Sequence, residues 1–171
     1  MYNQAFDLYH TLFRMLHILN IFDVKEKVEV ERLRIWDFYL LFPNKVHSIH
    51  IRGDEFQEAK SQRKFISKVD NPYNTISDGR KFLERVRPYQ MTALNYLASL
   101  GIIAVENLSN KMVVLLNREK LNSILANIGE LNTQEKNTLS WLSINFKTFP
   151  LNGPKGLKDR TGLLISKYDG K

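Results

Sequence analysis

Two histidines in a polar stretch, with acidic residues close behind them, are one group of residues in this sequence that could do chemistry. His47 and His50 stand three residues apart, and the acidic residues Asp54, Glu55 and Glu58 follow them. Imidazole nitrogens and carboxylate oxygens are common ligands of divalent metal ions. The stretch has no regular spacing, and two histidines in such a loop are more often ordinary loop residues. We therefore predict no metal site here.

Other residue patterns give no support to catalysis. His10 and His17 lie seven residues apart, which on a helix separates them by about 10 Å, too far to share one ion. The segment NGPKGLKDRTG, residues 152–162, has glycines and lysines but not the G-x-x-x-x-G-K-[ST] order of a phosphate-binding loop. The sequence contains no cysteine, which excludes thiolate nucleophiles and disulfides. We therefore predict a protein that is not an enzyme and has no cofactor.

Polar residues interrupt the apolar segment FDLYHTLFRMLHIL, Phe6–Leu19, and form a stripe along it. The stripe consists of Asp7, His10, Arg14 and His17. At about 100° per residue, the stripe covers roughly one third of a helix. It either faces water or forms a buried network, in which Asp7 or Asp37 pairs with Arg14 and orients this helix against the next one. The candidate polar network of the two helices is Asp7, His10, Arg14, His17, Arg34 and Asp37.

The same two helices carry more apolar side chains than one buried face requires. A helix that is apolar nearly all round must be covered by the rest of its domain or by another chain. We take this excess as the main indication of a protein partner. The candidate partner-binding residues are Phe6, Tyr9, Phe13, Leu16, Trp36, Phe38, Tyr39 and Phe42.

The elements that must position these residues are predicted to be helical. A first helix can begin at Asn3 or Asp7 and run to about residue 20. A second helix covers residues 28–42 and is ended by the following proline. Residues 44–77 are polar and poorly periodic, with a candidate helix at 55–68.

The rest of the chain has clearer patterns. Ser77 or Asp78 can cap a helix that stops near Arg87, and Pro88 then suits the first turn of a new helix that ends at Gly101. Two short apolar stretches follow, which predict a hairpin with a five-residue loop. The predicted strands are 102–106 and 112–116. Two helices follow at 118–128 and 133–149, the second capped by Thr133. The basic tail is either a flexible arm or contains a short strand at 162–166.

Helix, proline-started helix and hairpin follow one another in the order of a winged-helix core. We therefore predict a mostly α fold with a small β-hairpin, in which a winged-helix-like core follows an N-terminal helical pair. The helix before the hairpin, residues 89–100, contains no Lys, Arg or His, whereas DNA-reading winged helices use Arg and Lys on bases and phosphates. A protein-binding winged helix is favoured. The remaining candidates for contacts with a nucleic-acid backbone are Arg80, Lys81, Arg85 and Arg87.

Charge is unevenly distributed along the 171 residues. The net charge is +7, of which residues 1–42 contribute −1 and the remaining residues +8. A basic second part suggests anionic partners, either nucleic acid or an acidic protein surface. No window approaches 18 uncharged apolar residues, and the N-terminus lacks the basic leader of a signal peptide. We expect a cytoplasmic protein without a membrane span.

Three segments carry a family resemblance. They are FDLYHTLFRMLHIL (6–19), VERLRIWDFYLLFP (30–43) and GRKFLERVRPYQMTALNYLASLGII (79–103). In order and spacing they resemble the small middle component of bacterial ABC-three-component defence systems, the group that includes the Lamassu small subunit LmuC. The tail from residue 150 onward shows no such likeness.

The resemblance implies a non-enzymatic adaptor that bridges an ATPase of the SMC and Rad50 kind and an effector, commonly a nuclease. Recognition of foreign DNA by the ATPase would then release or activate the effector, and any DNA contact by the adaptor would be weak or indirect. The alternative from the residues alone is a winged-helix DNA-binding transcriptional regulator. The expected segments are a docking platform (1–43), a loop-rich connection (44–77), a winged-helix-like core with C-terminal helices (78–149) and a basic tail (150–171).

Overall fold

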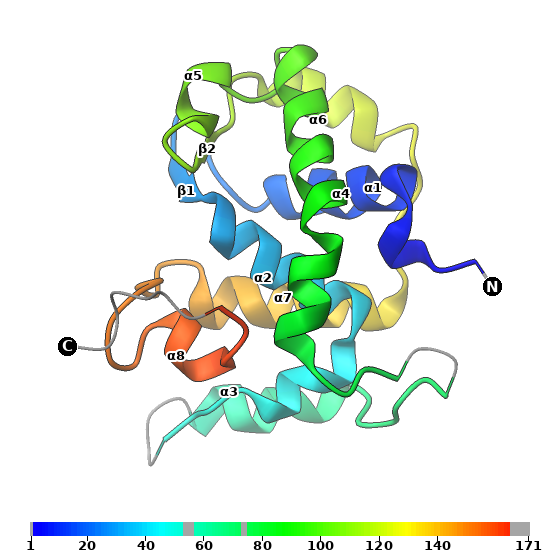
Figure 1. The fold of residues 1–171 in the computed structure, drawn as a ribbon, viewed down its shortest axis with the longest axis vertical. Coiled ribbons are helices and arrows are strands. Elements are labelled where there is room, and N and C mark those ends of the chain that lie inside the picture. Colours follow the sequence, from blue (N-terminus) through cyan, green and yellow to red (C-terminus); the bar gives the residue numbers. More distant parts are fainter. Residues whose placement is uncertain (1, 53–56, 73–74, 165–171) are drawn as a thin grey trace. The chain divides into compact units, whose positions relative to one another are not determined.

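A computed structural model describes residues 2–52, 57–72 and 75–164 of the chain. These residues form a mostly helical protein with a small antiparallel sheet of two strands (Figure 1). The prediction of a mostly α fold with little β-structure is confirmed. The elements are the helices α1 (Leu8–Leu19), α2 (Val30–Leu41), α3 (Gln57–Gln62), α4 (Gly79–Ser99), α5 (Val105–Leu108), α6 (Arg118–Leu125), α7 (Thr133–Phe146) and α8 (Leu157–Thr161), the strands β1 (Lys27–Glu29) and β2 (Met112–Val114), and 3₁₀ turns at Gln4–Phe6, Pro43–Ser48 and Arg63–Phe65.

The chain divides into two compact units, and each is built from two stretches of sequence. Unit 1 comprises residues 1–37 and 85–131, and unit 2 comprises residues 38–84 and 132–171. Helices α2 and α4 contribute residues to both units. Each unit therefore joins segments that lie far apart in the sequence.

Helix α1 of unit 1 begins at a well-formed N-cap. The carboxylate of Asp7 accepts a hydrogen bond from the backbone N–H three residues later, at 2.9 Å. Such a bond satisfies one of the free N–H groups at a helix start. Met15, Ile18 and Leu19 bury one side of the helix in the core. Of the two predicted starting residues, Asp7 caps α1, and Asn3 caps the preceding 3₁₀ turn.

The small sheet of unit 1 brings together two strands from distant parts of the sequence. Strand β2 pairs antiparallel with β1, and Val113 lies opposite Val28 (Figure 1). Strand β1 lies at the start of the segment in which the sequence predicts only a helix. The helix α2 therefore begins two residues later than predicted, because residues 27–29 are extended and pair with β2.

The predicted hairpin is reduced in the structure to a single bridge. Ile103 bridges to Leu115, and the backbone N–H of Ala104 donates to the Val114 carbonyl at 2.9 Å. The second half of the predicted first strand is instead the short helix α5. The extended geometry therefore ends after one bridge, and β1 supplies the strand partner of β2.

Helix α4 runs from Gly79 to Ser99 with Pro88 inside it. The prediction of two helices that meet at Arg87 is wrong. Proline cannot donate a backbone hydrogen bond and costs about 3 kcal/mol in a helix interior. The burial of one continuous face on both sides of the proline outweighs this cost. The buried residues of that face are Phe82, Leu83, Val86, Gln90, Ala93, Leu94 and Leu97.

In unit 2, helix α7 is held at its start by a capping box. The side chain of Asn132 accepts from the Glu135 N–H, and the Glu135 carboxylate accepts from the Asn132 N–H, both at 2.9 Å. The predicted cap, Thr133, is instead the first helical residue. Farther along α7, the indole of Trp141 donates to the Ala59 carbonyl of α3 at 2.9 Å, which ties these two helices together.

The described part of the basic tail contains a helix and not a strand. Leu157 of α8 is fully buried, and the guanidinium of Arg160 donates to the His50 carbonyl at 3.0 Å. Residues 162–164 are not in a strand, and the remaining two residues of the predicted strand lie outside the described ranges. The expected arm or strand is thus corrected, up to residue 164, to a helix anchored in unit 2.

Because Pro88 is exposed and interrupts the hydrogen bonding of α4, we expect Pro88→Ala to stabilise the protein by about 1–2 kcal/mol. The alanine restores a backbone donor in the helix interior. The thermal midpoint should rise by about 2–8 °C in a chain of this size. Thr92→Ala, at an exposed position of the same helix, is the control for intrinsic helix propensity alone. An unchanged or lower midpoint for Pro88→Ala would contradict this view of α4.

Candidate protein-binding groove

An ion pair buried in unit 1 joins α1 to α2. The Nε of Arg14 donates to Oδ1 of Asp37 at 2.5 Å, and Nη2 of Arg14 donates to Oδ2 at 3.4 Å. Asp37 is fully buried, and Arg14 is 3% exposed. Removal of either partner would leave an uncompensated buried charge. Of the two acids that the sequence offers for Arg14, the structure pairs it with Asp37.

Gln90 of α4 extends this polar network. Its amide nitrogen donates to Oδ2 of Asp37 at 2.8 Å and to the Arg34 carbonyl at 3.3 Å, and its amide oxygen accepts from Nε of Arg34 at 2.9 Å. Gln90 is itself fully buried. Sequence reasoning missed this residue, since it is uncharged, lies 53 positions from Asp37, and belongs to no local motif.

The other polar residues of α1 make separate contacts. The hydrogen bond from the His10 backbone N–H is the main reason that the pKa of the Asp7 carboxyl lies below its usual value. The imidazole of His10 lies edge-on to two tyrosine rings. Nε2 of His17 lies 3.2 Å from the Gly129 carbonyl. The predicted stripe therefore makes several kinds of contact, and the pairing of Arg14 with Asp37 is one that joins α1 to α2.

The aromatic residues of α2, and Phe42 directly after the helix, lie in the core. Trp36 is fully buried, and Phe38, Tyr39 and Phe42 are at most 4% exposed. Burial raises the pKa of the Tyr39 phenol, which stays neutral. A helix that is apolar nearly all round is expected to be enclosed, and here its own chain encloses it. The expectation that these four side chains offer an accessible binding surface is corrected, because they are core residues.

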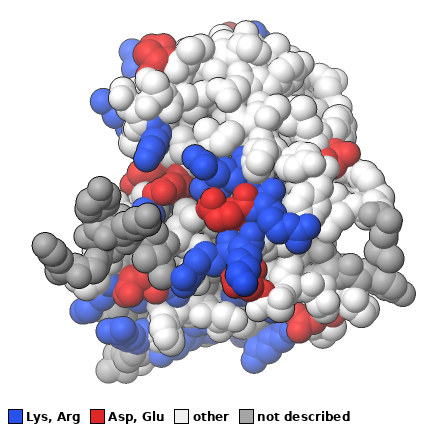
Figure 2. Space-filling model, viewed as in Figure 1, with Lys and Arg blue, Asp and Glu red and all other residues white. Residues whose placement is uncertain are grey.

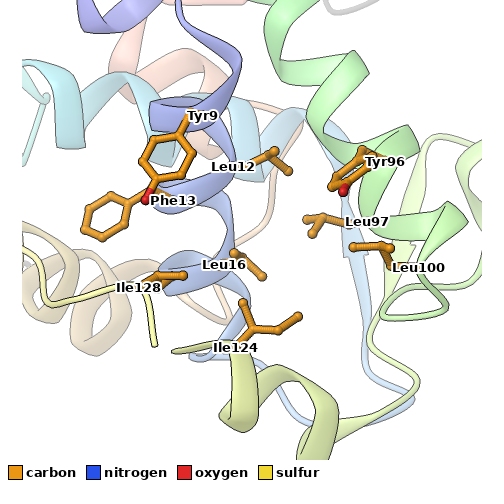
Figure 3. Close-up of a pocket in the computed structure, with 9 residues that line it drawn as sticks. All are labelled: Tyr9, Leu12, Phe13, Leu16, Tyr96, Leu97, Leu100, Ile124 and Ile128. Atoms are coloured by element: carbon orange, nitrogen blue, oxygen red, sulfur yellow. The ribbon is translucent and has the colours of Figure 1, made fainter. Parts of the chain in front are cut away.

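The apolar residues on the other side of α1 line a groove in unit 1. Tyr9, Leu12, Phe13 and Leu16 of α1 line it together with residues of α4 and of the α6 region, and Figure 3 shows Leu12 and Leu16 on the side of α1 toward the labelled residues of α4. The volume of the groove is about 310 Å³. Three of the candidate partner-binding residues (Tyr9, Phe13 and Leu16) therefore lie in one accessible feature. The full lining is Tyr9, Leu12, Phe13, Leu16, Tyr96, Leu97, Leu100, Ile124 and Ile128.

Two tyrosines mark the rim of this groove. Tyr9 is 66% exposed and Tyr96 is 50% exposed, whereas Leu16 and Leu97 are buried. Tyr96 is not among the candidate partner-binding residues that the sequence offers, and only the tertiary structure brings it beside α1. Phe6, the other candidate on the first helical segment, is half-buried and packs edge-on against Tyr89, with 5.8 Å between the ring centroids. Its partner Tyr89 is the neighbour of Gln90, which belongs to the buried polar network. Phe6 is not among the residues that line the groove.

The basic candidates of α4 are exposed at the N-terminal half of that helix. Figure 2 shows Lys and Arg side chains gathered in the middle of the visible face, with acidic side chains among them. Lys81 lies 3.9 Å from a carboxylate oxygen of Asp78, and the guanidinium of Arg85 lies over the Phe6 ring at 5.0 Å. The exposed residues of this cluster are Arg80, Lys81, Arg85 and Arg87.

The two loop histidines make structural contacts. Nε2 of His47 lies 2.9 Å from the Ile66 carbonyl, and the carbonyl of His50 accepts from an arginine of α8. Asp54 and Glu55 lie outside the described residues. Within residues 2–52, 57–72 and 75–164, no group of three His, Asp or Glu side chains is placed to hold a metal ion. The helices in these ranges also lack the length and apolar character required to cross a bilayer.

Comparison with protein families places this chain in a known group. Residues 1–169 match the family model for Middle Component 5 of ABC-three component (ABC-3C) systems. The chain belongs to this family. The matched range contains every residue of the network and of the groove. No curated protein and no solved structure matches the chain.

The expectation of an ABC-three-component middle component is therefore confirmed. A middle component works within a multi-component system, and the groove is a feature suited to such work. Its nine lining residues include no carboxylate, imidazole or amine, and its phenols come from the two rim tyrosines. Chemically, the groove of this middle component can bury apolar side chains of a partner, but it offers no strong acid or base.

We expect Asp37→Asn to lower the free energy of unfolding of the middle component by about 3–5 kcal/mol, because Arg14 would stay buried without a counter-ion. Arg14→Met should cost a similar amount. The double variant Arg14→Met/Asp37→Asn should lose less than the sum of the two single variants. Urea denaturation of all variants measures these differences. Additive losses, within about 0.5 kcal/mol, would show that the two side chains are not coupled.

Proposed function

We propose that this middle component is a non-enzymatic adaptor of an anti-phage or anti-plasmid defence complex. It would bridge an SMC-like or Rad50-like ABC ATPase and an effector nuclease, in the manner of the Lamassu small subunit. The family match to a middle component of a three-component system supports this role. The single structural observation that carries it is the apolar groove of unit 1, because a groove lined by nine apolar or aromatic residues suits protein contacts.

In this proposal, ATP hydrolysis and DNA cleavage belong to the other two components. The groove supports that division, since its lining residues provide no general acid, base or metal ligand near neutral pH. The protein would work in the cytoplasm, where foreign DNA appears in a bacterial cell. It would transmit the state of the ATPase to the effector by binding to both.

We further propose that unit 1 is a winged-helix-like scaffold used for protein binding. The order of elements supports this: α1, β1, α2, the second half of α4, the bridge at Ile103 and then β2. This is the order of helices and strands in a winged helix, with unit 2 residues inserted between α2 and the second half of α4. In such a scaffold, the last helix before the strands is the one that usually binds a partner.

The alternative function, a DNA-binding regulator, has one observation in its favour. Four exposed basic residues lie at the start of α4. The half of α4 nearest the sheet, however, presents Thr92, Asn95, Tyr96 and Ser99, and a neutral helix face gives few of the phosphate contacts that dominate DNA affinity. An adaptor is therefore the better account.

We expect Tyr9→Asp and Phe13→Asp to abolish co-purification of the middle component with one of the two other components encoded in its system. Both changes place a charge in the apolar groove and leave the core side of α1 unchanged. Ile144→Asp, at a 68% exposed position of α7, is the matched control and should keep the complex intact. Circular dichroism and thermal melting check that the variants fold.

A stable complex with both groove variants, together with normal phage protection, would argue against the groove as a docking site. A folded wild-type protein that fails to co-purify with either component would contradict the adaptor itself. Trp36→Asp is not a test of docking, because Trp36 is fully buried and its substitution would unfold the core.

We expect the isolated middle component to bind duplex DNA weakly at about 150 mM salt, with a shallow dependence of affinity on salt concentration. The reason is that the helix next to the sheet carries no cationic side chain from Tyr89 onward. A gel-shift titration at several salt concentrations measures this. Tight binding with a slope that corresponds to several phosphates, lost in an Arg80→Ala/Arg87→Ala variant, would favour the regulator instead.

A further inference from the structure

The groove of unit 1 has charged groups at specific places around its apolar lining. Lys120 lies four residues before Ile124 and so on the same face of α6. Its Nζ donates to the carbonyl of Leu100, which is itself a lining residue, and its side chain is exposed. One end of the groove therefore carries a positive charge that is free to meet solvent or a partner.

A second basic group flanks the side of the groove formed by α1. The imidazole of His17 packs edge-on against Phe13, with 4.7 Å between the ring centroids. The basic side chains that contact residues of the lining are therefore Lys120, at the Leu100 carbonyl, and His17, against the Phe13 ring.

The acidic residues on the same elements are directed elsewhere or already engaged. Asp7 accepts the backbone N–H at the start of α1. Glu119 lies about 140° around α6 from Ile124, and so on another face of that helix. Glu84 of α4 and Glu130, two residues beyond Ile128, each have an interaction partner within the chain. The surroundings of the groove are therefore electrostatically biased toward an acidic ligand.

The shape of the binding site favours a helical ligand. The lining residues come from α1, from α4 with the residue that follows it, and from α6 with the residues that follow it, and no strand edge is among them. An extended peptide that adds to a sheet needs such an edge, whereas an amphipathic helix needs an apolar groove between helices. The groove volume of about 310 Å³ corresponds to about ten water molecules, which a row of apolar side chains would displace.

We propose that the groove binds an amphipathic helix of one partner component, with apolar residues at positions i, i+3 or i+4, and i+7, and with Asp or Glu beside that apolar row. The apolar row fills the space between Tyr9, Leu16 and Tyr96. The acidic residues face Lys120, whose Nζ donates to the carbonyl of the lining residue Leu100. This inference rests on the proposed adaptor function and adds the chemistry of the partner segment.

Site-specific photo-crosslinking within the assembled complex tests this proposal. The full-length middle component carries p-benzoylphenylalanine in place of Tyr9 or Tyr96, or of Ile144 as a control, and is co-expressed with the two other components of its system. Mass spectrometry then identifies the crosslinked peptide. The expected result is a crosslink from both groove positions, and not from Ile144, to one helical segment of one partner with an apolar row and acidic flanks.

A crosslink from Tyr9 or Tyr96 to a second copy of this chain, to a basic segment, or to an extended segment would overturn the proposal. So would an intact complex in which neither groove position crosslinks. These results would leave the adaptor function standing, since the complex itself would have formed. Failure of the three components to assemble at all would overturn both.

Charge reversal at the end of the groove gives an independent measurement. Lys120→Glu should weaken the affinity of the middle component for that partner at least tenfold, and Lys120→Arg should retain it. Lys81→Glu is the matched control, since the side chain of Lys81 is 85% exposed on α4 and the net charge changes by the same amount. Equal affinities for Lys120→Glu and Lys81→Glu would contradict the role of Lys120.

Discussion

The ion pair between Arg14 and Asp37 is the interaction on which the arrangement of unit 1 depends. It joins α1 to α2 through two almost completely buried side chains, and Gln90 brings α4 into the same network. Apolar packing alone would tolerate small rotations of α1, but a buried charge pair is stable only when its geometry is maintained. The network therefore fixes which side of α1 is turned inward. The opposite side, which carries Tyr9 and Phe13, is turned to the groove as a consequence.

This arrangement explains how a small protein can combine a stable core with an apolar groove at its surface. Trp36 and the aromatic residues after it are enclosed by their own chain and supply stability. The groove is a separate feature with partly exposed tyrosines at its rim, and a tyrosine combines a large apolar ring with a hydroxyl that remains in contact with water. In the proposed adaptor, such a division would let the groove be occupied or vacant while the core is unchanged.

Local sequence patterns predicted the helices α1, α2, α6 and α7 and part of the site, and long-range packing decided the rest. The cap at Asp7 and the end of α2 before Pro43 follow from the nature of single residues and their neighbours. The pairing of β1 with β2 joins residues more than 80 positions apart, and the uninterrupted path of α4 through Pro88 depends on the burial of its apolar face. In the site, Arg14 and Asp37 were recognisable because a charge in an apolar helix is conspicuous. Gln90 and Ile124 carry no such signal, and only the tertiary structure brings them to α1.

The central claim is that this protein acts through the groove beside α1, held in position by the buried ion pair. Hydrogen exchange of the backbone amides, compared between the free middle component and its complex with the other two components, tests this claim most directly. The account predicts slower exchange on complex formation in residues 8–19 and 118–128, with little change along α7. Protection confined to α7 and the other helices of unit 2, with none in α1, would contradict it.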